Sequence, residues 1–216
     1  AVPRIYFGTG SETNVFLETT MEEYVCGGDA AKKAKIPHFH PLRGSVGRLC
    51  DSAHLCNELD NVDFFIRNVN IQDDAVNKAN KDVNVFFASL LHGTKHVQAG
   101  LSNLDALDDV LRLAAIIGGG EETLKTNPLV SFIACVVKSP LQMVEDTANI
   151  VMEVAGRGMP LVISSSPQGG STAPVQEEGM VAQINAEILA GITLAQLVNP
   201  GTPVLYGAVP VRARLD

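Results

Sequence analysis

The densest group of residues that could do chemistry is the segment SSSPQGGSTAP, residues 164–174. Its adjacent glycines, Gly169 and Gly170, let backbone N–H groups approach a ligand closely, and the hydroxyl groups of Ser171 and Thr172 can orient polar atoms. A phosphate-binding loop usually has G-x-x-x-x-G-K-[ST] spacing, whereas no lysine follows the glycines here. Three interpretations stay open: phosphate binding, binding of another ligand, and an ordinary strand-to-helix turn.

Charge in this part of the chain is one-sided, because residues 159–211 contain no lysine or arginine. A site for a cationic ligand should exclude competing cations, and Glu187, inside a long apolar helix pattern, could stabilise such a ligand. Two alternatives remain. Central barrel segments carry few charges in general, and Glu187 could lie at an exposed edge or make an ordinary hydrogen bond to another helix.

Motifs for metal binding and nucleophilic catalysis are weaker. His38 and His40 have H-x-H spacing and His92 and His96 have H-x-x-x-H spacing, but Gly93 between the second pair would end a helix. The four cysteines show no zinc-site spacing, and the G-x-S-x-G elbow is absent. We therefore expect no metal site, histidines that are solvated or hydrogen-bonded, and the reduced thiols of a cytoplasmic protein.

Composition excludes several classes of protein. The 216 residues include 16 Lys and Arg against 24 Asp and Glu, a formal net charge of −8, so a nucleic-acid groove is not expected. The apolar content of 46% suffices for a large core. Residues 179–198 are nearly uncharged, but Gln183, Asn185 and Gln196 interrupt them on several faces, which predicts a buried helix and no membrane span.

The elements that must position these residues alternate regularly from residue 61 onward, as is typical of parallel βα units. The expected strands are residues 61–70, 94–100, 129–137, 160–166 and 202–206. The expected helices are residues 73–91, 102–117, 121–125, 141–155 and 174–198. Residues 1–60 carry weaker signals, with short strands at 5–10 and 14–17 and a helix at 43–59, and they lead into the βα units of residues 61–216 within a single domain.

In a parallel α/β fold the active groups lie at the C-terminal ends of the strands and in the loops that follow. That rule alone makes Asn68 and Gln98 site candidates. Five βα strands could form a doubly wound open sheet, and they are too few for a closed (β/α)8 barrel. Sequence periodicity does not separate these two architectures.

The run GGSTAPVQEEGMVAQINAEILAGITLAQLVNPGTPVLYG, residues 169–207, closely resembles the trimethylamine methyltransferase (MttB-type) family. Its pattern combines Gly-Gly-Ser/Ala-Thr-x-Pro-Val, N-A-E-x-L-x-G-I-x-L-A-Q-L and P-G-x-x-V-x-Y-G. Weaker likeness extends upstream through FGTG at residues 7–10, LCDSAHLCNELDNVDFF at 49–65, GGGEE at 118–122 and SPL at 139–141.

The resemblance implies a TIM (β/α)8 barrel, of which this chain would form an incomplete, central portion. It implies transfer of a methyl group from a small methylated amine, such as trimethylamine or glycine betaine, to the cobalt of a corrinoid carried by a partner protein. It implies further that Gly169, Gly170, Ser171 and Thr172, together with Tyr206 and Gly207, line the cavity. Tyr206 and Glu187 are then the candidates that this chain offers for holding a cation.

Two alternatives stand beside this interpretation. The chain could be a non-catalytic barrel fragment that serves as a binding or assembly module, or a barrel enzyme that binds phosphate at Gly169 and Gly170. An incomplete barrel would also leave apolar surface uncovered, which predicts a homo-oligomer. In the trimethylamine enzymes pyrrolysine lies beyond the point that corresponds to Asp216, so the resemblance does not tell whether this protein uses it.

Overall fold

A five-stranded parallel sheet forms the centre of the computed structural model, which describes residues 4–26 and 32–212. The strands are β3 (Phe64–Ile66), β4 (His96–Ala99), β5 (Val130–Ala134), β8 (Leu161–Ser165) and β10 (Val204–Ala208). Their order in the sheet is their order in the chain, β3-β4-β5-β8-β10. A doubly wound sheet reverses direction at a switch point, so this order identifies a half-barrel and confirms the incomplete TIM barrel.

The N-terminal residues extend this sheet by one further strand position. Gly8 bridges to Phe64 in parallel, and the Asp63 N–H donates to the carbonyl of Phe7 at 2.7 Å. A Cβ at Gly8 would lie 2.3 Å from the Phe64 ring, so only glycine allows this approach. Residues 7–9 therefore occupy the position before β3.

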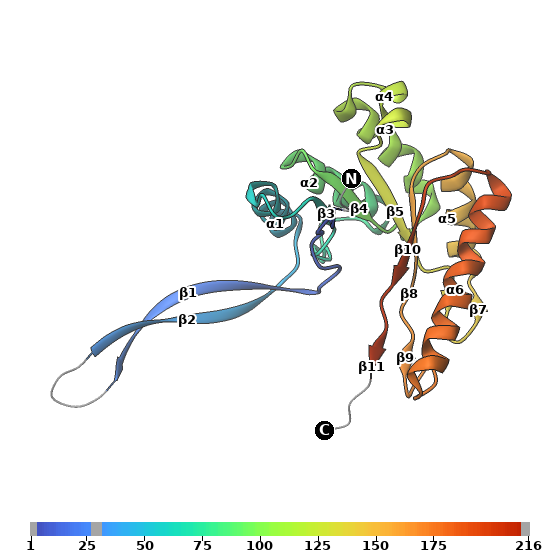
Figure 1. Ribbon diagram of the computed structural model, residues 1–216. Helices are drawn as coiled ribbons and strands as arrows, with labels where there is room; N and C mark the ends of the chain where they lie inside the picture. The colour runs from blue at the N-terminus through green and yellow to red at the C-terminus, as the bar shows by residue number, and fades with distance from the viewer. Residues whose placement is uncertain (1–3, 27–31, 213–216) are drawn as a thin grey trace.

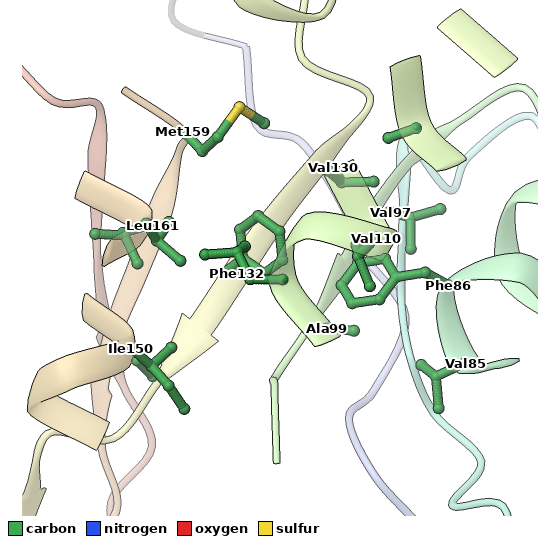
Figure 2. Packing of buried hydrophobic residues seen from close by; sticks show 14 of the residues in the cluster. Val85, Phe86, Val97, Ala99, Val110, Val130, Phe132, Ile150, Met159 and Leu161 are labelled. Atoms are coloured by element: carbon green, nitrogen blue, oxygen red, sulfur yellow. The ribbon is translucent and has the colours of Figure 1, made fainter. Parts of the chain in front are cut away.

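Helices cover one face of the sheet (Figure 1). They are α1 (Val46–Glu58), α2 (Lys81–Leu91), α3 (Leu107–Gly118), α4 (Glu121–Thr126), α5 (Glu145–Gly156) and α6 (Glu177–Val198), with short 3-10 turns η1 (Lys78–Asn80) and η2 (Leu104–Ala106). The core lies between them and the strands, where the rings of Phe86 on α2 and Phe132 on β5 pack with centroids 5.5 Å apart (Figure 2). Both rings are fully buried.

Helix α6 begins and ends close to the expected positions, but it is less buried than the sequence predicts. Ile184, Ile188 and Gly191 face the sheet, whereas Val181 and Leu197 are 61% and 78% exposed. By length and composition alone this helix could cross a membrane. It packs against β8, β10 and α5 as the helix of a barrel does.

The connection between β5 and α5 differs from the expected early helix start at residue 141. Strands β6 (Val137–Lys138) and β7 (Gln142–Met143) pair in antiparallel around a cis Ser139–Pro140 bond, and α5 begins only at residue 145. Leu141 has φ +56°, which no helix accommodates. Pro140 therefore lies in a tight turn here, where the sequence suggested the first turn of a helix.

Among the described residues, the longest β-structure was not predicted from the sequence, apart from a short strand at 14–17. Strands β1 (Val15–Cys26) and β2 (Lys32–Arg43) form an antiparallel hairpin that projects from the sheet (Figure 1). Its prolines obscured β2 in the sequence, and they are tolerated because each strand of a two-stranded ribbon has a free edge. The hairpin precedes α1, so it is an insertion at the C-terminal end of the first strand position.

Candidate functional site

A cavity of about 490 Å³ opens at the C-terminal ends of the strands, on the face opposite the helices. The register pairs Ile133 with Val162, and both side chains point into this cavity, whereas their neighbours Phe132 and Leu161 point into the helix-covered core. The lining residues come from every parallel strand and from the segment after the first strand position. They are Ser11, Glu12, Ile66, Arg67, Gln98, Ala99, Gly100, Ile133, Cys135, Val162, Ser164, Ser166, Gly207 and Val209.

One ion pair supplies the charge of this lining. Among the described residues that line the cavity, only Glu12 and Arg67 are charged, and the Arg67 guanidinium lies 2.9 Å from the Glu12 carboxylate. The Arg67 side chain is 13% exposed, and its Nη1 also lies 3.4 Å from Oδ1 of Asn70. Glu12 has φ +28°, a left-handed conformation that costs a non-glycine residue roughly 1–3 kcal/mol and tends to occur at functional sites.

Gln98 and Gly207 are the two predicted site residues that line the cavity. Gln98 is 6% exposed, and its side-chain amide forms no hydrogen bond with any described residue, so the polar atoms of that side chain are available to a ligand. A Cβ at Gly207 would lie 3.1 Å from the Ser164 side chain, so glycine keeps this wall of the cavity open. Beside it, Cys135 Sγ lies 3.0 Å from Ser164 Oγ.

The backbone N–H groups of the Gly169–Thr172 loop form hydrogen bonds within the loop itself. The backbone N–H groups of Ser171, Thr172 and Ala173 all donate to the Gln168 carbonyl, at 2.9–3.0 Å, and the Gly170 N–H donates to the Ala173 carbonyl. An anion cradle needs free N–H groups that converge on the ligand. These N–H groups already have partners, which weighs against phosphate binding here. Gly169 itself lies in β9 (Gln168–Gly169), which pairs with β11 (Val211–Arg212).

Glu187 lies between α6 and the sheet, only 2% exposed. Its carboxylate accepts hydrogen bonds from the hydroxyls of Ser139 and Ser165, from the Leu141 N–H and from the Gln183 amide. Burial alone would raise the pKa of Glu187, but these donors outweigh it and hold the pKa below its ordinary value. The carboxylate therefore joins α6 to the β6–β7 turn and to the end of β8, and it is not among the groups that line the cavity.

Tyr206 and Asn68 also lie outside the cavity lining. Tyr206 shares its register position with Ile163, on the helix side of the sheet, and its hydroxyl lies 3.2 Å from Oδ1 of Asn185 on α6. Asn68 faces α1, where its side-chain nitrogen donates to Ser52 Oγ at 2.7 Å. The structure thus brings Gln98 and Gly207 together and separates them from the other predicted site residues.

Comparison with known proteins gives a family that agrees with the half-barrel architecture. A family model described as trimethylamine methyltransferase (MTTB) matches residues 42–215. The chain belongs to the MTTB family. It is 34% identical over 163 residues to trimethylamine methyltransferase MttB1 of Methanosarcina mazei, which covers 74% of this chain and 32% of that protein.

Bacterial relatives match as well. The chain is 34% identical over 174 residues to trimethylamine methyltransferase MttB of Desulfitobacterium hafniense, covering 80% of the chain and 34% of the relative. It is 35% identical over 129 residues to a glycine betaine methyltransferase of the same species, covering 59% of the chain and 26% of the relative. This MTTB chain therefore spans about a quarter to a third of the length of these curated relatives.

Sequence reasoning missed both charged residues of the cavity in this MTTB chain. Arg67 directly follows β3, so the same strand-end rule that selected Asn68 could have found it. Glu12 carries no such signal, because it lies in an irregular segment before the hairpin. It is held beside Arg67 by its own backbone N–H, which donates to the Arg67 carbonyl at 3.1 Å, and by the parallel bridge of Thr13 with Val69.

Proposed function

We propose that this MTTB-family chain is the substrate-binding part of a methyltransferase that moves a methyl group from a methylated amine to a corrinoid held by a partner protein. The cavity at the strand ends is the proposed amine site. The observation that carries this proposal is the Glu12–Arg67 pair in a lining that is otherwise uncharged among the described residues. A carboxylate attracts an alkylammonium group, and family membership supplies the reaction class.

The same pair favours a zwitterionic quaternary amine over trimethylamine. Glu12 would attract the ammonium end, and Arg67 would pair with a substrate carboxylate through the bidentate geometry that guanidinium groups provide. The net charge of the pair is zero, as is that of glycine betaine. The Gln98 amide would orient the substrate between them.

The proposed methyl transfer requires little acid–base catalysis from the residues of this chain. The corrinoid supplies the cobalt that accepts the methyl group. A quaternary nitrogen that loses a methyl cation leaves as a neutral amine, so no side chain has to protonate it. The contribution of Glu12, Arg67 and Gln98 is then to position the substrate and to replace its water shell with fixed polar groups.

Methyl transfer to a reduced corrinoid protein tests the proposal, with this chain within its full-length protein and with trimethylamine and glycine betaine offered separately. Methylation is followed by the change in corrinoid absorbance. We expect Arg67→Gln to raise the KM for glycine betaine about 10–100-fold, because a charge-assisted hydrogen bond is lost. Arg157→Gln, which removes a cation that pairs with Asp108 far from the cavity, should leave this KM unchanged.

Absence of corrinoid methylation with either amine would contradict the proposal. Binding of the corrinoid protein without turnover would instead support the non-catalytic assembly module. An Arg67→Gln protein with an unchanged KM for glycine betaine would leave methyl transfer intact and exclude the zwitterion site.

We also propose that the protein is a cytoplasmic homo-oligomer. Exposed apolar side chains gather on the outer strand β10 and on α6, where Leu205, Val181 and Leu197 are all more than half exposed. Large apolar side chains exposed on neighbouring elements are candidates for a contact with protein. Light scattering of the purified protein checks the assembly, and a monomer at high concentration would contradict it.

A further inference from the structure

The polar face of the β1–β2 hairpin carries three potential metal ligands. Glu22, His38 and His40 each offer one ligand atom, and these atoms all lie within 4.8 Å of one another. Among the described residues this is the one such group of three. It belongs to the projecting ribbon and not to the strand-end cavity (Figure 1).

Antiparallel pairing creates this group. His38 and His40 are two residues apart on β2, so both point to the same face, and their ring centroids lie 4.8 Å apart. Thr20 pairs with His38 and Glu22 pairs with Ile36, which makes Glu22 the diagonal neighbour of His38 on that face. The H-x-H spacing alone offers two ligands, and the hairpin adds the third.

The surroundings of the two imidazoles suit a bound cation. Glu18 is the cross-strand partner of His40, so a second carboxylate lies on the same face. Thr20 Oγ1 lies 2.8 Å from Nε2 of His40, which is the kind of outer contact that orients a metal-ligating histidine. Apart from the histidines, Glu18 and Glu22 are the charged side chains of this face in the part of the hairpin whose side chains the structure describes.

We propose that Glu22, His38 and His40 bind one divalent late first-row transition-metal ion, with Zn²⁺ as the physiological candidate. Two imidazoles and one carboxylate match the ligand preference of zinc and leave its fourth position open. This donor set disfavours Mg²⁺ and Ca²⁺, which take oxygen ligands. The proposal departs from the expectation of no metal that the sequence raised.

Little movement is needed to form the site. Zinc–ligand bonds of about 2.1 Å place tetrahedral ligand atoms roughly 3.4 Å apart. Glu22 and His38 are exposed and His40 is half-buried, so rotamer changes can close the remaining gap. The ion would join β1 to β2, which matters because an isolated two-stranded hairpin is only marginally stable in water.

Isothermal titration of the metal-free 216-residue chain with ZnCl2 tests the proposal. We expect one equivalent of Zn²⁺ to bind. The double variant His38→Ala/His40→Ala should weaken that binding by more than about 100-fold, and Thr20→Val should weaken it by roughly 10-fold through the loss of the orienting hydroxyl. A matched control is His54→Ala/His92→Ala, which removes the other neighbouring histidine rings, 6.4 Å apart, and should change nothing.

Limited trypsin digestion gives a second readout that does not depend on heat signals. Lys35 lies within β2, so cleavage after it requires the hairpin to open. Zn²⁺ should slow this cleavage in the unmodified chain and in the control, and not in the His38→Ala/His40→Ala variant. Failure of the unmodified chain to bind Zn²⁺, or equal binding by the His38→Ala/His40→Ala variant, would overturn the proposal.

Discussion

The parallel sheet and the β1–β2 hairpin are both built from alternating side chains, but they use the alternation differently. In the sheet, one set of residues packs under helices and the other set faces the cavity, so Phe132 and Leu161 are fully buried. In the hairpin, Leu17, Met21 and Phe39 form an apolar face that is more than half exposed. The sheet therefore derives its stability from packing between layers. The hairpin depends instead on cross-strand pairs and on any ligand or protein surface that covers one of its two faces.

Truncating one phenylalanine in each region should give the largest contrast. Phe132→Ala leaves a cavity between β5 and α2, and we expect a loss of about 3–5 kcal/mol in the free energy of unfolding. Phe39→Ala on the hairpin removes a ring that is 56% exposed, and its effect should stay within about 0.5 kcal/mol. Urea unfolding measures both. A large effect of Phe39→Ala would mean that the apolar face of the hairpin is covered in solution.

Glu187 provides a test of how the helices are attached to the sheet. Glu187→Gln places an amide opposite four donors, so at least one hydrogen bond is lost, at a cost of about 1.5–3 kcal/mol. Glu178→Gln on the exposed side of the same helix is the control and should be neutral.

The pKa of Glu187 gives this prediction a pH dependence. Because the folded state holds the pKa below the ordinary glutamate value of about 4.3, the carboxylate stabilises the fold above that pH. This contribution is lost as the pH falls through the folded-state pKa. The difference in unfolding free energy between wild type and Glu187→Gln should therefore shrink in acid, and a difference that stays constant would contradict the assignment.

A smaller pH effect should come from His96 on β4. Burial lowers the pKa of His96, although the hydrogen bond of its Nδ1 with the Pro128 carbonyl opposes the shift. The unfolded chain then binds a proton more readily, so stability should decline as the pH falls below about 6.5. His96→Gln should flatten this slope in urea unfolding between pH 7 and 5. The exposed His92→Gln variant should keep it.

Much of the fold could be predicted from local patterns. All five expected strands of the parallel sheet and all expected helices are present, because apolar runs and capping residues report on neighbours in the chain. Most boundaries move by a few residues, but the helix expected from residue 73 begins as α2 only at Lys81, after the turn η1. The early start assigned to α5 was wrong, since a proline that can open a helix can also occupy a tight turn. The hairpin was missed although Gly27 and Gly28 lie between its strands in the sequence, because Pro37 and Pro41 in β2 argued against a strand there.

The candidate site was harder to predict than the fold. The strand-end rule selected Gln98, which lines the cavity, and also Asn68, which faces α1. Glycines and hydroxyls in one loop suggested a ligand cradle, but the loop uses its own N–H groups internally. Whether the backbone N–H groups of a loop are free to bind a ligand depends on the folded conformation of that loop, and the amino-acid composition does not reveal it.

By itself, the sequence determined the βα alternation, the approximate positions of the five parallel strands and of the helices, and the family motifs of residues 169–207, because these are properties of consecutive residues. Only the tertiary structure decided the order of the strands, the face on which Tyr206 and Glu187 lie, and the meeting of Glu12 with Arg67 and of Glu22 with His38. The side chains of residues 204–208 are apolar or small on both faces apart from the Tyr206 hydroxyl, so alternation of polar and apolar residues does not indicate which face of this strand lies against the helices. Residues that lie far apart in the chain, such as Glu12 and Arg67, come into contact only after the register and the order of the strands have been set.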